Sequence, residues 1–173
     1  MRIDQCPAAQ KMNEVRNYLA LAVEEAEKAL CEGNYPFGAV LTDDNGKIVV
    51  IGHNENFSKN DISAHAEIQC LRKMDIRKLL DEKNKYHLFC SGEPCGGCSF
   101  FIVRTNITHV TWALTDPQKA GFDDLRKNKE LASFFEHIEV SVEPFEDLRE
   151  KSALLLREYY QRLGQVEKAK MYE

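Results

Sequence analysis

The sequence of 173 residues has no hydrophobic run that approaches the ~20 residues of a membrane-spanning helix. Residues 1–10 lack the basic-then-apolar pattern of a secretory signal, so we expect a cytoplasmic protein. Positive charge is not in excess either, because the formal net charge is −5, which argues against a nucleic-acid partner. Six cysteines do not make a disulfide framework in a chain of this length. With no internal repeat or linker, we expect one domain over residues 1–173.

One pattern stands out against this ordinary composition. His65-Ala66-Glu67 is followed thirty residues later by Pro94-Cys95-Gly96-Gly97-Cys98. One imidazole and two thiolates are ligands that zinc prefers, and a set of three leaves the fourth tetrahedral position for water, as in a catalytic site. The sequence therefore predicts a Zn²⁺ site at His65, Cys95 and Cys98. The pattern resembles the zinc deaminases of the cytidine deaminase-like superfamily, in which the glutamate, here Glu67, is the catalytic acid and base.

Two other interpretations of the cysteine pair are open. A Cys-x-x-Cys that begins a helix after a strand is also typical of a thioredoxin-like redox pair, but such a pair does not need His65 and Glu67. A closed structural zinc site would need a fourth protein ligand, which Cys70 or Cys90 could supply. Both of these cysteines lie in apolar runs, so we expect them to be buried small hydrophobic residues.

Hydrophobic periodicity predicts strands that alternate with helices. The expected helices cover residues 12–31, 63–74, 95–104, 123–135 and 145–163. The expected strands cover residues 37–41, 48–51, 86–90, 107–114 and 138–142. This order predicts the α/β class, a three-layer α/β/α sandwich with a five-stranded mixed sheet, as the resemblance also implies. Residues 165–173 have no core pattern, and we expect a polar C-terminal tail.

Local signals refine this outline. Gly33 is expected to end the first helix, and Asn45-Gly46 predicts a hairpin between the first two strands. Residues 65 and 67 point about 200° apart on a helix, so they can line one cavity only from its first turn. The sequence thus places both ligand sets at helix starts.

Glu67 has a defined task if zinc is present. It would accept the proton of the water, deliver it to a ring nitrogen of the substrate and protonate the departing amine. We expect a hydrolytic deaminase, and the alternative is a non-enzymatic binding module of the same fold that zinc stabilises.

Further segments are similar to those of bacterial guanine deaminases. These segments are Pro36-Phe37-Gly38-Ala39-Val40, Gly52-His53-Asn54, Asn60-Asp61 and Ala120-Gly121-Phe122-Asp123-Asp124. The resemblance implies a nucleobase substrate, with guanine first. By the same resemblance, Asn54 would bind the base through its amide, Phe37 and Ala66 would adjoin it, and Asp124 would be a second carboxylate near the amino group. It also implies a homodimer.

Some positions differ from those relatives. Gly96-Gly97 and Phe100-Phe101 replace residues of different bulk, and we expect both pairs to alter the wall beside the metal. Cytosine and nucleoside deaminases are similar around the zinc residues, and tRNA adenosine deaminases share the zinc core. Another aminated heterocycle is a further candidate substrate.

Overall fold

The computed structural model describes residues 7–115, 121–142 and 145–173. Five strands form one sheet in the order β2-β1-β3-β4-β5. Their bounds are Gly38–Asp43 for β1, Ile48–His53 for β2, Tyr86–Gly92 for β3, Ile107–Leu114 for β4 and Glu139–Val142 for β5. β1 pairs antiparallel with β2 and with β3, whereas β4 is parallel to both of its neighbours. The predicted five-stranded mixed sheet is confirmed.

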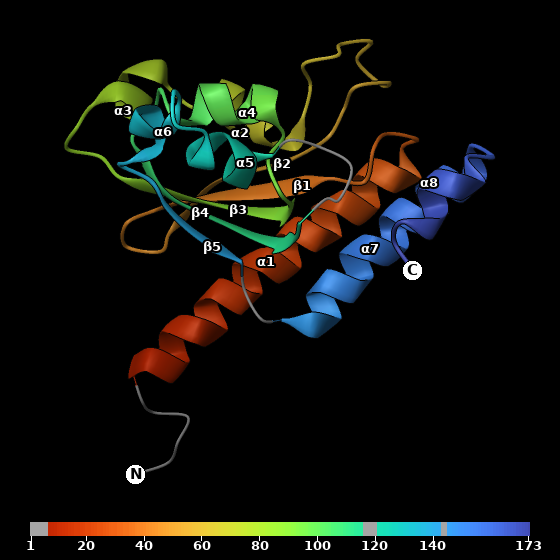
Figure 1. Cartoon of the computed structure of the whole chain (residues 1–173). Helices are drawn as coiled ribbons and strands as arrows, with labels where there is room; N and C mark the ends of the chain where they lie inside the picture. The colour runs from red at the N-terminus through yellow and green to blue at the C-terminus, as the bar shows by residue number, and fades with distance from the viewer. Residues whose placement is uncertain (1–6, 116–120, 143–144) are drawn as a thin grey trace.

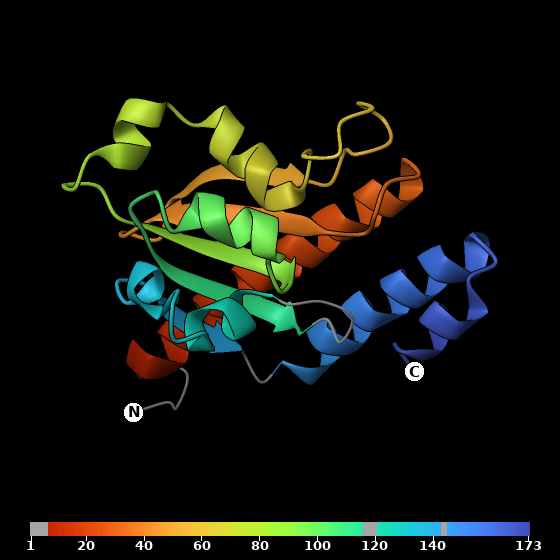
Figure 2. The ribbon, with the colours of Figure 1, turned by 45° about the horizontal axis from the view of Figure 1, so that its top comes forward.

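Helices cover both faces of this sheet (Figure 1). On one face lie α1 (Pro7–Cys31) and α7 (Glu146–Arg162), and the short α8 (Val166–Lys170) packs against α7. On the other face lie α2 (Ala66–Lys73), α3 (Ile76–Leu80), α4 (Gly96–Ile102), α5 (Phe122–Lys127) and α6 (Ala132–Phe135). Figure 2 shows this second layer in front of the strands. The structure is therefore the three-layer sandwich that the sequence predicted.

The central strands are buried on both faces because their side chains alternate between two cores. In β1, Ala39 and Leu41 pack in the core under α2 and α4, whereas Val40 packs under α1 and α7. At Gly38, a Cβ atom would lie 2.1 Å from the backbone oxygen of Ala22. Glycine at this position is what allows α1 to approach the sheet so closely.

Gly33 and Gly46 lie in the turns that the sequence predicted. Gly33, with φ of 80°, follows the end of α1, and its N–H donates to the carbonyl of Leu30 at 3.1 Å. Gly46, also at φ of 80°, closes the β1–β2 hairpin by donating its N–H to the carbonyl of Asp43.

Three segments differ from the prediction. Residues 123–135 form two helices, α5 and α6, because Asn128 turns the chain between them and accepts the N–H of Glu130. The charged segment 75–85 contains α3, which Asp75 caps by accepting the N–H of Arg77. The expected polar tail folds back as α8, in which Ala169 is buried, and Tyr172 beyond its end is buried as well.

Within the described part of the chain, no helix has both the length and the apolar character required to cross a membrane.

Candidate active site

Both halves of the metal motif lie at the starts of helices. His65 is the N-cap residue of α2, and Cys95 is the N-cap residue of α4, separated from the end of β3 at Gly92 by Glu93 and Pro94. Neither side chain makes a capping hydrogen bond to its own helix. Cys98 is one turn further along α4 and is buried. The packing of α2 and α4 on the same face of the sheet thus brings together ligands that lie thirty residues apart in the sequence.

The three side chains converge on one point. His65 Nδ1 lies 3.5 Å from Cys95 Sγ and 3.4 Å from Cys98 Sγ, and all three ligand atoms lie within 4.8 Å of one another. A tetrahedral Zn²⁺ with ordinary bond lengths separates a nitrogen from a sulfur ligand by about 3.6 Å. The donor set and its spacing therefore fit zinc with three protein ligands. In the described residues, no other group of three such side chains converges in this way.

The two thiols differ in their electrostatics. A hydrogen bond with Cys98 lowers the pKa of Cys95 well below that of a free thiol, and His65 adds to this effect against the opposing effect of burial. The interaction with Cys95, together with burial and the Glu67 carboxylate, raises the pKa of Cys98. Both cysteines bind zinc as thiolates, so metal binding releases protons from the pair.

Glu67 is the second residue of α2 and faces the same point. Its Oε2 atom lies 3.5 Å from Cys98 Sγ, and only 6% of the residue is exposed. His65 and Glu67 both line one cavity, as the position at the first helical turn predicted. The carboxylate can therefore exchange protons with a water bound beside the cysteines.

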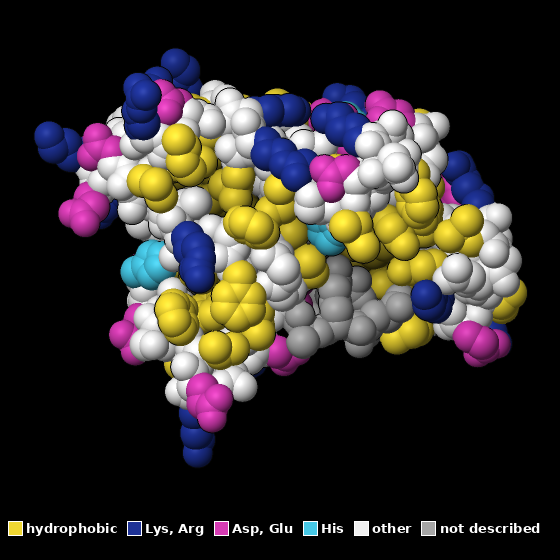
Figure 3. Space-filling view, turned by 90° about the horizontal axis from the view of Figure 1, so that it is seen from above, with side chains coloured by type: hydrophobic (Ala, Val, Ile, Leu, Met, Phe, Trp, Pro, Cys, Tyr) yellow, Lys and Arg dark blue, Asp and Glu magenta, His cyan; other side chains and the backbone are white. Residues whose placement is uncertain are grey.

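A cavity of about 750 Å³ opens over this cluster. Its walls are aromatic and polar, and they are formed by Tyr35, Phe37, Asn54, Asn56, Phe57, Asn60, Asp61, Ile62, His65, Glu67, Glu93, Cys95 and Tyr160. Within the described ranges, its formally charged lining side chains other than the histidine are the carboxylates of Asp61, Glu67 and Glu93. Figure 3 shows hydrophobic side chains on both sides of a histidine in the middle of this face. The size fits a small organic molecule, and the walls favour a planar apolar ring with a few polar contacts.

Phe37 and Asn54 both line the cavity. Phe37 packs over Gly92, where a Cβ atom would approach its ring to 2.8 Å. Asn54 is buried, and its amide already makes two local bonds, donating to Asn56 Oδ1 at 2.7 Å and accepting the Asn56 N–H at 3.1 Å. The asparagine therefore both shapes its loop and presents an amide edge to the cavity.

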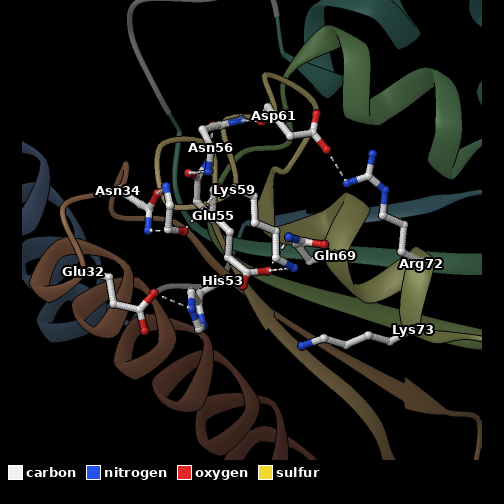
Figure 4. Close-up of polar contacts among 12 residues, drawn as sticks. Glu32, Asn34, His53, Glu55, Asn56, Lys59, Asp61, Gln69, Arg72 and Lys73 are labelled. Atoms are coloured by element: carbon white, nitrogen blue, oxygen red, sulfur yellow. Dashed lines mark hydrogen bonds and ion pairs between the residues drawn. The ribbon is translucent and has the colours of Figure 1, made fainter.

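Residues 54–62 form much of one wall, and of these residues the sequence predicted a substrate contact only for Asn54. Asn34 supports this loop from behind, since its buried Oδ1 accepts the N–H groups of Phe57 and Ser58 at 2.9 and 3.0 Å. Two ion pairs stabilise the loop: Lys59 pairs with Glu55, and Arg72 pairs with Asp61 (Figure 4). The clustered asparagines of this segment were the available sequence signal for an ordered loop.

Tyr160 reaches the cavity from α7 and was not among the predicted site residues. Its ring stacks on Tyr172 with centroids 5.9 Å apart and an interplanar angle of 12°. Lys168 lies over the same ring at 5.4 Å. No local motif marks Tyr160, because its position depends on how α7 and α8 fold against each other.

Two predicted substrate residues lie elsewhere in the structure. Asp124 is exposed in the first turn of α5, and Ala66 is buried in the first turn of α2, and neither is among the lining residues. Ala120, the first residue of the resembling segment, lies outside the described residues.

The two unusual pairs in α4 also differ from expectation. A Cβ atom at Gly97 would meet only Cys95 Sγ, at 3.9 Å, so this glycine is not required by a close approach. Phe100 and Phe101 are 38% and 58% exposed and do not line the cavity, because they lie on the outer side of the helix. The cavity wall in this region includes instead Glu93, which follows β3, and residues of the 54–62 loop.

Comparison with known proteins now decides the family. The model of the cytidine and deoxycytidylate deaminase zinc-binding region matches residues 12–114, more than half of the 173 residues, and includes every ligand of the cluster. The chain belongs to this family.

The proteins that this chain resembles are named for different substrates. The tRNA-specific adenosine deaminase of Streptococcus pyogenes serotype M1 is 31% identical over 118 residues, which are 66% of this chain and 66% of that protein. A structure from a study of A-to-I editing by tRNA:A34 deaminases has a TM-score of 0.67 at 25% identity, covering 82% of this chain and 99% of that one. The guanine deaminase from Nitrosomonas europaea has a TM-score of 0.66 at 19% identity, covering 92% and 87%, and shows a shared fold. Membership in this family supports a hydrolytic zinc deaminase and leaves the substrate undecided.

Proposed function

We propose that this protein is a zinc-dependent aminohydrolase that deaminates a small uncharged nucleobase or related aminated heterocycle, with guanine as the first candidate. The observation that carries the proposal is the convergence of His65, Cys95 and Cys98 beside the buried Glu67 at the floor of a cavity with aromatic walls. Zinc at this position supplies the Lewis acidity that makes water nucleophilic near neutral pH.

The protein residues then have separate tasks. Glu67 Oε2 takes one proton from the attacking water and delivers it to the ring nitrogen next to the reacting carbon. It then takes the remaining hydroxyl proton from the added oxygen and delivers it to the leaving amino group, which departs as ammonia. Phe37 and Tyr160 hold the ring by stacking and apolar contact. The amide of Asn54 bonds the polar edge of the ring, since it offers both a donor and an acceptor. Asp124 would act only if the segment after residue 120 brings its carboxylate toward the substrate.

The charges of the site favour a small molecule over tRNA. Among the residues that the structure describes, no lysine or arginine lines the cavity, and three of the lining residues are acidic: Asp61, Glu67 and Glu93. The cations at its edge are already engaged, with Lys59 on Glu55 and Arg72 on Asp61. A phosphate backbone needs cationic partners, so this surface supports an uncharged substrate better than a polyanion.

The deciding experiment is an ammonia-release assay with zinc-loaded protein. The panel contains guanine, guanosine, cytosine, cytidine, adenine, adenosine, aminated pteridines and triazines, and a tRNA anticodon stem-loop. We expect turnover of guanine. Turnover of another free base or heterocycle would replace guanine but keep the reaction class, and turnover of the stem-loop alone would favour the activity named for the tRNA relatives. No ammonia from any compound would favour the non-enzymatic module.

We also propose a homodimer that acts in the cytoplasm as a single-domain enzyme. Phe100 and Phe101 expose apolar rings on α4, next to the ligand turn, and a two-fold contact would cover them. Cysteine ligands also suit a reducing compartment. Light scattering of the native chain and of Phe101→Glu tests the dimer, which the glutamate is expected to dissociate.

A further inference from the structure

Glu93 is a buried carboxylate in the cavity wall for which the proposed reaction has no use. It follows β3 directly and lies two residues before the ligand Cys95. Its backbone N–H donates to the carbonyl of Leu114 at 2.8 Å, which extends the pairing of β3 with β4. Only 4% of the residue is exposed, so burial of its carboxylate needs a specific partner.

That partner is the start of α5. Glu93 Oε1 accepts the backbone N–H of Asp123 at 2.9 Å. The N-cap residue of α5 is Gly121, which has no side chain to accept this N–H. Glu93 thus caps α5 from a segment that lies about thirty residues earlier in the sequence.

The lack of a side chain at Gly121 leaves the space that the Glu93 carboxylate occupies. A Cβ atom at Gly121 would lie 2.3 Å from Glu93 Oε1 and 2.4 Å from its carboxyl carbon, which no side chain tolerates without displacing Glu93. The φ angle of Gly121 is −92°, so the requirement for glycine is one of space and not of backbone conformation. Two positions far apart in sequence therefore depend on each other.

Backbone contacts connect the same two segments. The N–H of Phe122 donates to the carbonyl of Pro94 at 3.0 Å, and Cys95 and Gly121 form an isolated β-bridge. Phe122 is fully buried, with its ring 5.0 Å from that of Phe135 and 6.4 Å from that of Trp112. The turn that carries Cys95 is therefore attached to a segment that is itself anchored in the core.

We propose that Glu93 is a positioning residue for the metal centre, which fixes the Cys95 turn by capping α5 in the space that Gly121 leaves. A ligand that is held in place before the metal arrives loses less conformational freedom on binding. Residues that support metal ligands in other proteins contribute about 10- to 100-fold to affinity. This role concerns the metal ligands and is independent of which heterocycle is the substrate.

The test measures zinc affinity by competition with a chromophoric chelator, which needs no substrate. We expect Glu93→Ala to weaken zinc binding by at least about tenfold, in the range given for supporting residues. Glu93→Gln keeps a carbonyl acceptor for the Asp123 N–H, and its affinity is expected to stay within about threefold of the native value. Glu136→Ala, which removes an exposed glutamate, is the control for loss of one negative charge.

A double-mutant cycle separates this role from general destabilisation. Gly121→Ala should weaken zinc binding as Glu93→Ala does, because it displaces the carboxylate. In Glu93→Ala/Gly121→Ala the added methyl group has room, so the double variant is expected to bind zinc no more weakly than Glu93→Ala alone. Additive losses, or native affinity in a folded Glu93→Ala protein, would overturn the proposal. If Glu93→Ala does not fold, a Gly121→Ala protein with native zinc affinity would overturn it equally.

Discussion

The carboxylate of Glu67 lies 3.5 Å from the sulfur of Cys98, at the floor of the cavity. This contact places a proton-transfer group beside the zinc ligands without making it one of them. The His65, Cys95 and Cys98 side chains already supply the three protein ligands of an open site. Chemistry and metal binding are therefore separable by mutation.

Glu67→Gln should stop the chemistry but leave zinc binding intact. The amide has nearly the same size, so we expect stoichiometric zinc and a native circular dichroism spectrum. It cannot accept and return a proton, so ammonia release should fall by about 10²- to 10⁴-fold. Zinc analysis and steady-state assay on the same preparation provide the measurement. A fully active Glu67→Gln protein would remove this carboxylate from the mechanism.

Loss of a metal ligand should abolish activity together with zinc. Cys95→Ser is expected to bind zinc much more weakly, because a serine hydroxyl is a poor replacement for a thiolate. Cys31→Ser changes an exposed free cysteine and should leave zinc content and activity unchanged. Dialysis against a chelator should likewise inactivate the native protein, and added Zn²⁺ should restore it. Full activity in metal-free protein would contradict the proposed reaction.

Tyr160→Ala should act mainly on substrate binding. Stacking of one base on an aromatic side chain contributes about 1–3 kcal/mol, so KM is expected to rise by roughly 5- to 100-fold with a smaller change in kcat. Tyr160→Phe keeps the ring and should stay near the native KM. Equal KM values for the alanine variant and the native protein would mean that this wall does not touch the substrate.

His87 should make the folded protein sensitive to acid. Burial, with help from the charges of His109 and Lys11, lowers the pKa of His87 to about 3. Its ring stacks on Phe89 at 3.9 Å and bonds Thr111 Oγ1 at 2.7 Å. Below about pH 6.5, His87 is protonated in the unfolded chain but stays neutral in the folded chain. The free energy of unfolding should therefore fall between pH 6.5 and 3, by at most about 1.4 kcal/mol per pH unit.

His87→Gln removes this titration and provides the comparison. Denaturant unfolding of both proteins, zinc-loaded, at pH 6.5 and pH 5.0 measures the two slopes. Because zinc release at acid pH affects both proteins alike, it cancels in the difference. We expect the variant to lose less stability over this interval, and parallel slopes would rule out His87 as the source.

Much of the fold could be predicted because its signals are local. Each of these signals is contained in a short stretch of sequence. They are the apolar stripe of α1, the turn glycines Gly33 and Gly46, and the β-branched residues of β4. The metal ligands were predictable for a related reason, since two short motifs at helix starts carry all three. Zinc chemistry restricts the residue types there to very few.

The rest of the cavity depends on contacts that no local pattern encodes. Tyr160 reaches the site only because α8 turns back and places Tyr172 behind it. Glu93 stands next to the cysteine motif, but its partner, the N–H of Asp123, is thirty residues away. The exposed position of Asp124 likewise follows from the short α5 and not from the sequence around it. Tertiary packing therefore decides which side chains accompany the metal.

The packing of Phe122 near Trp112 has a practical consequence. Trp112 is the single tryptophan of the chain, is almost fully buried, and donates its indole N–H to Thr115. Its fluorescence emission should therefore be blue-shifted in the native protein. Since Phe122 belongs to the segment capped by Glu93, a red shift on mutation would register loosening of that segment without any added dye. The fluorescence of Trp112 thus reports directly on the segment that supports the metal centre.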